Sequence, residues 1–295
     1  MSAEPAGTSA TRQQSNILAA LGWMTIALLC FSTFAVAGRQ AGKEIDPLQI
    51  MLWRGPISLV LLAIVALVTG ARARTHALPL QITRNIFHFG AQFSWLTALG
   101  LIPLAELFAL EFTAPLWVAI LAPLVLGERL TGTRLIAALL GFVGVIIVVQ
   151  PGSQPLSVGM VFALASALGF AASMVTTKIL TRTDSAFTIL VYMMGIQTVF
   201  ALVLGLPGFV LPSAVTLAWV FVLSVAGLVA HFSLASAFKR ADAILVAPMD
   251  FLRLPLIATV GALVYGEALD PLVAVGAAVI IAANLLNIRG ERKAR

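Results

Sequence analysis

"ELFALEFTAPLWVAILAPLVLGERL", residues 106–130, aligns without a gap with "LVAPMDFLRLPLIATVGALVYGEAL", residues 245–269. In this alignment Glu111 falls on Asp250, and both copies end in Gly-Glu-x-Leu. Each copy also contains two prolines inside an apolar run. Apolar composition alone rarely matches an acidic position and an ending together, so the two copies indicate an internal repeat.

The composition identifies a membrane protein. Apolar residues make up 60% of the 295-residue chain and the mean hydropathy is +1.04, too hydrophobic for a water-soluble domain of this length. A helix that crosses a hydrocarbon core of about 30 Å needs about 20 mostly apolar residues. Ten such runs lie near residues 17–37, 48–69, 83–101, 104–126, 132–150, 156–178, 187–210, 215–238, 243–265 and 270–288. We therefore predict an all-α membrane protein with ten transmembrane helices and no separate soluble domain.

The distribution of basic residues predicts the orientation. With a cytoplasmic amino terminus, 14 of the 18 lysines and arginines lie on the cytoplasmic side, and Arg39 and Lys43 lie on the opposite side. Positively charged loops remain in the cytoplasm. We expect a multi-pass protein of the inner (plasma) membrane with both termini cytoplasmic. The basic charge then marks loops, so nucleic acid is not an expected partner.

The predicted domains follow from the repeat and the spans. Five helices in each half insert the second copy in the opposite orientation, which predicts a 5+5 inverted repeat, the architecture of many secondary transporters. The expected parts are a disordered cytoplasmic tail (1–16), a first five-helix repeat (17–150), a second five-helix repeat (151–288) and a basic cytoplasmic tail (289–295).

The ninth predicted span contains two charges, Asp250 and Arg253. Arg253 lies about ten residues into the span, near the bilayer midplane. An exposed charge there costs about 2.5–3.5 kcal/mol, so both residues are expected inside the protein. They form an ion pair on one helical face, or Arg253 binds a substrate carboxylate while Asp250 sets its pose or answers a substrate ammonium. These interpretations are compatible, and Glu111 is expected to line the same space.

Five further residues are candidates for binding. His88, Gln92 and Trp95 are spaced i, i+4 and i+7, which gives the third helix one polar and aromatic face. Gln92 falls on His231 in the repeat alignment. Both histidines are either packed helix contacts or lining of a polar cavity. Tyr192 is either an interface aromatic or a cavity wall.

Prolines interrupt the fourth and ninth spans at corresponding positions. Pro115 and Pro123 lie in one, Pro248 and Pro255 in the other, and each removes a backbone hydrogen bond. Such breaks persist in a membrane where a neighbour or water satisfies the freed carbonyl. Matched interruptions in two repeats point to a binding site. We expect Pro115, Pro248 and Pro255 to act in gating.

Several motifs resemble a known family. "P-x-W-V-A-I" from Pro115, "LGERL" at 126–130, "LWRG" at 52–55 and "YGEAL" at 265–269 resemble the EamA domains of the drug/metabolite transporter superfamily. The resemblance covers nearly the whole chain and implies a ten-helix inverted-repeat exporter of small metabolites. Within the family, the sequence is similar to the YddG-type exporters of aromatic and other amino acids. The second copy has no arginine matching that of "LWRG", which argues against a strictly symmetric gate.

The expected function is secondary transport. We predict export of amino acids, aromatic and others, or of similar small metabolites by alternating access, without a cofactor or a bound metal. The expected partners are the small-molecule substrate and the lipid bilayer, and the chain is expected to be a monomer or homodimer. Export of cationic drugs is the alternative within the superfamily. An intramembrane enzyme is disfavoured because no H-E-x-x-H motif or paired nucleophile and base occurs in the sequence.

Overall fold

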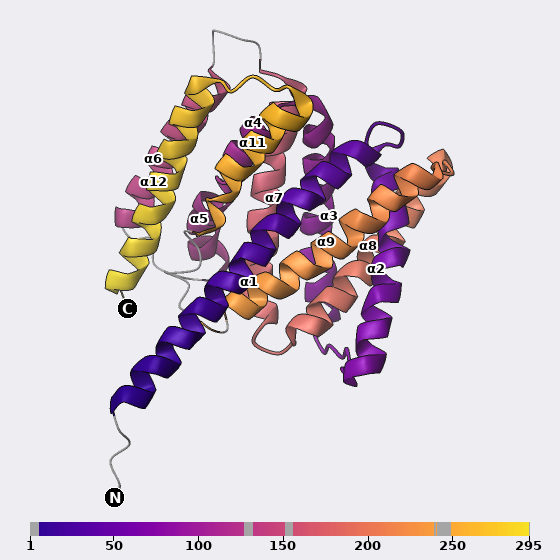
Figure 1. The fold of residues 1–295 in the computed structure, drawn as a ribbon, viewed down its shortest axis with the longest axis horizontal. Coiled ribbons are helices and arrows are strands. Elements are labelled where there is room, and N and C mark those ends of the chain that lie inside the picture. The colour runs from indigo at the N-terminus through magenta and orange to yellow at the C-terminus, as the bar shows by residue number, and fades with distance from the viewer. Residues whose placement is uncertain (1–5, 127–131, 151–155, 239, 241–248, 295) are drawn as a thin grey trace, which may run out of the picture.

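The computed structural model describes residues 6–126, 132–150, 156–238, 240 and 249–294, and all regular elements in these ranges are helices (Figure 1). In chain order they are α1 (Ala6–Ala41), α2 (Pro47–Thr69), α3 (Leu78–Leu101), α4 (Leu104–Glu111), α5 (Ala114–Leu126), α6 (Gly132–Val149), α7 (Val158–Leu180), α8 (Ala186–Gly205), η1 (Leu206–Gly208), α9 (Ala214–Phe238), α11 (Arg253–Tyr265) and α12 (Pro271–Ala294).

Among the described residues, six segments are long and apolar enough to cross a membrane, whereas ten spans were expected along the whole chain. They are Leu18–Ala41, Pro47–Thr69, Leu104–Val125, Val158–Leu180, Ala186–Gly208 and Ala214–Ala237. Three shorter apolar helices cover Leu135–Val149, Arg253–Tyr265 and Pro271–Leu286. The remaining helix, α3, has 24 residues but carries buried polar groups that include Gln81, Arg84 and Asn85. Its polar side chains face the protein interior, which is why hydropathy alone does not identify it.

The first and last helices extend beyond the predicted spans. Residues 6–16, expected to belong to a disordered tail, continue α1, and residues 289–294, expected to form a tail, continue α12. Neither extension contains a proline that would stop the helix. Alanine, arginine, lysine, glutamine and glutamate in these stretches favour helix outside the apolar region.

Side-chain bonds show which helix ends lie together. Glu44, between α1 and α2, accepts hydrogen bonds from the backbone and hydroxyl of Ser213 before α9. At the same end of the bundle, Gln49 of α2 donates to the carbonyl of Gly205, the last residue of α8, at 2.7 Å. At the opposite end, Asp184 joins the α7–α8 loop to the start of α3. Neighbouring helices therefore run in alternating directions.

The packing repeats between the two halves. α1 packs most extensively on α9, α3 on α7, α2 on α8 and α6 on α12. α1 and α7 are the first helices of the two halves, and α3 and α9 are the third, so exchange of the halves converts the α1–α9 pair into the α7–α3 pair. The α2–α8 and α6–α12 pairs map onto themselves. In Figure 1 the α6–α12 and α2–α8 pairs form opposite edges, with α1 and α9 crossing between them.

Two glycines bring α6 and α12 into backbone contact. A Cβ atom at Gly144 would lie 2.9 Å from the carbonyl oxygen of Gly276, and a Cβ at Gly276 would lie 2.8 Å from that of Gly144. No larger residue fits at either position without separating the helices. Small residues at helix interfaces are the usual means of close packing in membranes.

The Asp184 contact predicts a pH-dependent contribution to stability. Burial alone raises the pKa of Asp184, but hydrogen bonds from Thr75, Gln81 and Thr183 lower it below its ordinary value. A lowered pKa in the folded state stabilises the fold above the ordinary aspartate value of about 4, and the effect is lost as the pH falls through the folded-state pKa. We expect Asp184→Ala to reduce the free energy of unfolding by about 1–3 kcal/mol at neutral pH.

This expectation is checked by thermal unfolding in detergent between pH 3 and 7. The difference between wild type and Asp184→Ala should shrink in the acid part of this range. A difference that is constant with pH would mean that the carboxylate charge is not involved.

Candidate substrate-binding site

The fourth predicted span is broken into two helices. α4 ends at Glu111 and α5 begins at Ala114, with a turn at Phe112 and Thr113 between them. Pro115 has no N–H to donate to the carbonyl of Glu111, so a regular helix cannot continue. The break therefore falls where proline was expected to distort the helix, but the chain restarts as a separate helix rather than a kinked one.

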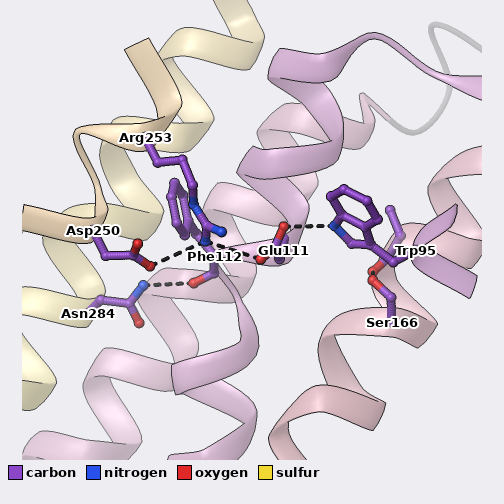
Figure 2. Close-up of polar contacts among 8 residues, drawn as sticks. Trp95, Glu111, Phe112, Ser166, Asp250, Arg253 and Asn284 are labelled. Atoms are coloured by element: carbon purple, nitrogen blue, oxygen red, sulfur yellow. Dashed lines mark hydrogen bonds and ion pairs between the residues drawn. The ribbon is translucent and has the colours of Figure 1, made fainter. Parts of the chain in front are cut away.

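A buried amide satisfies the carbonyl that the break releases. The N–H of Leu116 donates to the carbonyl of Thr113 at 2.9 Å instead of that of Phe112. The side chain of Asn284 in α12, which is 1% exposed, donates to the carbonyl of Phe112 at 2.7 Å (Figure 2). A neighbouring helix thus replaces the missing backbone bond, as irregular backbone within a membrane requires.

The second repeat is interrupted at the equivalent place. Met249 and Asp250 are helical, Phe251 and Leu252 form a turn, and α11 begins at Arg253. Pro255 lies in the first turn of α11, whereas Pro248 falls outside the described residues. The rings of Phe112 and Phe251, one from each turn, meet edge to face with centroids 5.2 Å apart. The two breaks therefore face each other.

A charged cluster lies between the two breaks (Figure 2). The Nη2 atom of Arg253 is 3.1 Å from Oε1 of Glu111 and 3.2 Å from Oδ2 of Asp250. The indole of Trp95 donates to the other oxygen of Glu111 at 2.8 Å. The predicted ion pair between Arg253 and Asp250 is thus present. Glu111 of the first repeat is a second carboxylate partner of Arg253.

Aromatic rings shelter the guanidinium of Arg253. It lies 4.9 Å from the ring centroid of Phe31, 5.0 Å from that of Phe108 and 5.3 Å from that of Phe112. Each such contact stabilises a cation by about 0.5–2 kcal/mol, most when water is excluded. Oδ1 of Asp250 is buried without a hydrogen-bond partner in the described part of the chain. The cluster therefore keeps an acceptor that a bound molecule can use.

The predicted polar face of α3 divides into separate environments. Only Trp95 reaches Glu111. His88 is 2.9 Å through Nδ1 from the side-chain amide of Gln197 in α8, and its ring packs edge-on against Phe170. Gln92 is buried.

The remaining two candidates lie on the second repeat. His231 of α9 packs edge to face against Phe31, with ring centroids 5.6 Å apart. It thereby shares a neighbour with the guanidinium of Arg253, which also lies over Phe31. Tyr192 is half-buried on α8, and no hydrogen bond joins it to the cluster within the described ranges.

Two polar features were not predicted. Asn284 was missed, although an amide within the apolar run of the last helix was a visible signal. Arg84, at the start of the predicted span 83–101, was counted with the basic residues of the cytoplasmic side, but it is 7% exposed within α3 and donates from Nε to the hydroxyl of Thr177 at 2.7 Å. The third span was predicted to begin at residue 83, whereas α3 begins at Leu78. The inward-facing polar residues near its start lower the hydropathy there, so the predicted span covered only the more apolar part of the helix.

Comparison with known proteins assigns the family. The model of the EamA-like transporter family matches residues 18–150 and again residues 157–289, so the chain contains two repeated domains. The protein belongs to the EamA-like transporter family. It is a multi-pass membrane transporter of the drug/metabolite transporter superfamily.

Its relatives transport different metabolites. The chain is 30% identical to a riboflavin transporter of Rhizobium johnstonii, over 97% of this chain and 96% of the relative. It is 26% identical to an S-adenosylmethionine uptake transporter of Rickettsia bellii, over 93% and 94%, and 25% identical to a pseudopaline exporter of Pseudomonas aeruginosa, over 88% and 93%. A crystal structure with a TM-score of 0.65 and 20% identity, covering 96% of this chain and 99% of its own, shares the fold. These relatives give no specific support to the expected likeness to YddG-type amino acid exporters.

The geometry of the cluster predicts unequal roles for its two carboxylates. Glu111 holds both Arg253 and Trp95 and has a side chain 15% exposed, whereas Asp250 holds Arg253 alone and has a side chain 32% exposed. Loss of one partner of a buried ion pair costs about 3–5 kcal/mol, and the cost falls with exposure. We expect Glu111→Gln to lower the melting temperature of the purified protein more than Asp250→Asn does. Equal effects would contradict the deeper role of Glu111.

Proposed function

We propose that this protein is a secondary carrier that moves a small metabolite with an aromatic ring across the inner membrane by alternating access. The observation that supports it most is the pair of opposed helix breaks with a charged cluster between them. Interrupted helices at corresponding positions of two repeats are typical of carrier substrate sites. The chain offers no nucleotide-binding motif that would couple transport to ATP.

We propose ten crossing segments arranged as two inverted halves. Arg39 at the end of α1 donates to the carbonyl of Ile102 after α3, and Gly159 at the start of α7 packs against the same Ile102. The first half therefore begins at the end of the bundle opposite to the one where the second half begins. The start of α1 and the end of α12 both lie toward the lower left of Figure 1, in keeping with an even number of crossings. The excess of basic residues then makes that side cytoplasmic.

Two observations support an aromatic metabolite as the substrate. The charged cluster is enclosed by aromatic rings, among them Phe31, Phe108 and Trp95. A relative with 30% identity over nearly the whole chain is a riboflavin transporter. Aromatic walls with a few polar groups are the usual surroundings of such ligands.

Amino acid export is a second candidate, favoured by the cluster itself. Glu111 and Asp250 provide carboxylates for a substrate ammonium, and Arg253 provides a guanidinium for a carboxylate. A bound amino acid would compete with the internal ion pairs.

Transport by the purified protein in liposomes tests both candidates. We expect saturable uptake of riboflavin, or of tryptophan, and countertransport when the same compound is loaded inside. Trp95→Phe, which keeps the ring but removes the donor to Glu111, should reduce transport about ten-fold or more, as loss of one hydrogen bond to a charged group removes about 1.5–3 kcal/mol. Arg72→Gln, in the loop after α2, serves as the control. No flux of either compound above empty liposomes would overturn the proposal.

One end of the bundle is closed by a network between the halves. Arg39 of α1 forms an ion pair with Glu267 after α11, and the same carboxylate accepts from the backbone N–H of Leu104 at 2.8 Å. The guanidinium of Arg39 also lies 4.8 Å from the ring centroid of Tyr265. Alternating access requires these contacts to break when this end opens.

Glu267→Gln should therefore shift the protein toward a state open at this end. Spin labels at Lys43→Cys and Ala268→Cys, in a Cys30→Ala background, report the distance across it by pulsed electron resonance. We expect the variant to populate longer distances than the parent. Asp184→Asn, which removes a carboxylate at the opposite end of the bundle, is the control, and an unchanged distribution in Glu267→Gln would contradict a closing role.

A further inference from the structure

Arg54 of α2 is a buried cation without an acceptor. Its residue surface is 4% exposed, and its Nε atom is enclosed with no hydrogen-bond partner. Within the described part of the chain, its guanidinium has no hydrogen bond or ion pair, and it lies over the face of Phe34 at 5.0 Å from the ring centroid. An aromatic face repays only part of the cost of removing a full charge from water. Arg54 thus holds an unused set of donors.

The other buried or half-buried arginines on the described helices each have at least one hydrogen-bond acceptor, although Nε of Arg253 is also enclosed without a partner. Arg253 has two carboxylates, and Arg39 has Glu267 and a backbone carbonyl. Arg84 donates to a hydroxyl, an amide oxygen and a thioether sulfur. Lack of an acceptor is therefore a particular property of Arg54 and not a general feature of arginines in this fold.

Snorkelling does not explain Arg54. The residue lies about 10 Å along α2 from its start, close enough for a long side chain to reach water at that end. The α8–α9 connection covers this end: Gln49 donates to the carbonyl of Gly205, and Trp53 donates to that of Val210 at 3.2 Å. The guanidinium remains inside the bundle, so the alternative of a membrane-surface anchor fails in this conformation.

Two glycines shape the space around this side chain. A Cβ at Gly227 of α9 would lie 3.4 Å from Nη2 of Arg54 and 3.2 Å from the ring of Phe34. A Cβ at Gly55 would overlap Thr198 of α8. Glycine at both positions lets α2, α8 and α9 close around the guanidinium.

Aromatic contacts connect Arg54 to the charged cluster between the helix breaks. Phe34, which lies under Arg54, packs against Trp95 with ring centroids 5.7 Å apart. Trp95 in turn donates to Glu111, which binds Arg253. A molecule bound at the cluster and at Phe34 lies within reach of the free guanidinium.

We propose that Arg54 binds an oxyanion of the transported molecule, either a carboxylate or a phosphate. A neutral acceptor would supply hydrogen bonds but leave the buried charge uncompensated, whereas an oxyanion supplies both and matches the guanidinium in a bidentate arrangement. This inference rests on the proposed carrier function and adds to it the charge of the substrate.

Matched pairs of probes test the inference on the purified full-length protein in nanodiscs. Riboflavin 5′-phosphate against riboflavin measures preference for a phosphate, and tryptophan against tryptophan amide measures preference for a carboxylate. We expect wild type to bind the anionic member of at least one pair about ten-fold more tightly, and Arg54→Gln to abolish that preference. Arg54→Lys should retain part of it, and Arg72→Gln should retain all of it.

The outcomes separate this inference from the carrier proposal. Wild-type liposomes that transport neutral and anionic probes equally would leave the carrier intact and overturn the role of Arg54. A preference that survives in Arg54→Gln would overturn it as well. Wild-type protein that neither binds nor transports any of the four probes would overturn the carrier proposal and, with it, this inference.

Thermal unfolding without ligand provides a readout that does not depend on transport. Because Arg54 is buried without a counter-charge, Arg54→Met should raise the melting temperature by about 2 °C or more, whereas Arg253→Met should lower it. A decrease for Arg54→Met as large as that for Arg253→Met would give Arg54 a structural role and overturn the inference.

Discussion

A hydrocarbon layer offers no water to a backbone carbonyl or a charge, and this constraint shapes the centre of the protein. Two helices break opposite each other, so polar backbone appears where water is scarce. Asn284 satisfies the carbonyl of Phe112, and the guanidinium of Arg253 is held by Glu111 and Asp250 beneath aromatic rings. Irregular backbone and charge are tolerated inside the protein because each has a hydrogen-bonding or ionic partner on another helix. These partners are also polar groups that a transported solute can bind.

Much of the charged cluster and of the two helix breaks could be predicted from the sequence, because the two copies of the repeat each contain a corresponding part of them. Alignment of the two copies pairs Glu111 with Asp250, and the prolines mark the positions of the breaks. The pairing of Arg253 with Asp250 followed from a spacing of three residues. The family also followed, since its motifs occur in both copies, whereas the narrower likeness to amino acid exporters rested on loose motifs and received no specific support.

Other features depended on tertiary contacts that a single sequence does not encode. Helical spacing put His88 and Trp95 on one face, yet His88 contacts Gln197 and only Trp95 reaches Glu111. Helical periodicity predicts which residues share one face of a helix, but it does not predict which residue of another helix each of them contacts. Polar residues facing inward also made α3 less apolar than a typical span, which moved its predicted start from residue 78 to residue 83 and put Arg84 at the edge of the span. The role of Asn284 could not be predicted from residue types, because it donates to a backbone carbonyl and not to a side chain.

The glycine contact between α6 and α12 has a consequence for how such a molecule can be assembled. Each half presents its last helix to the last helix of the other half, and Gly144 and Gly276 meet backbone to backbone. In the repeat alignment Gly144 falls on Ala283 and Gly276 on Ala137, so two copies of one half would place glycine against alanine here. The glycine-to-glycine contact therefore depends on two halves that have diverged within one chain, just as only the first half carries an arginine at the position of Arg54.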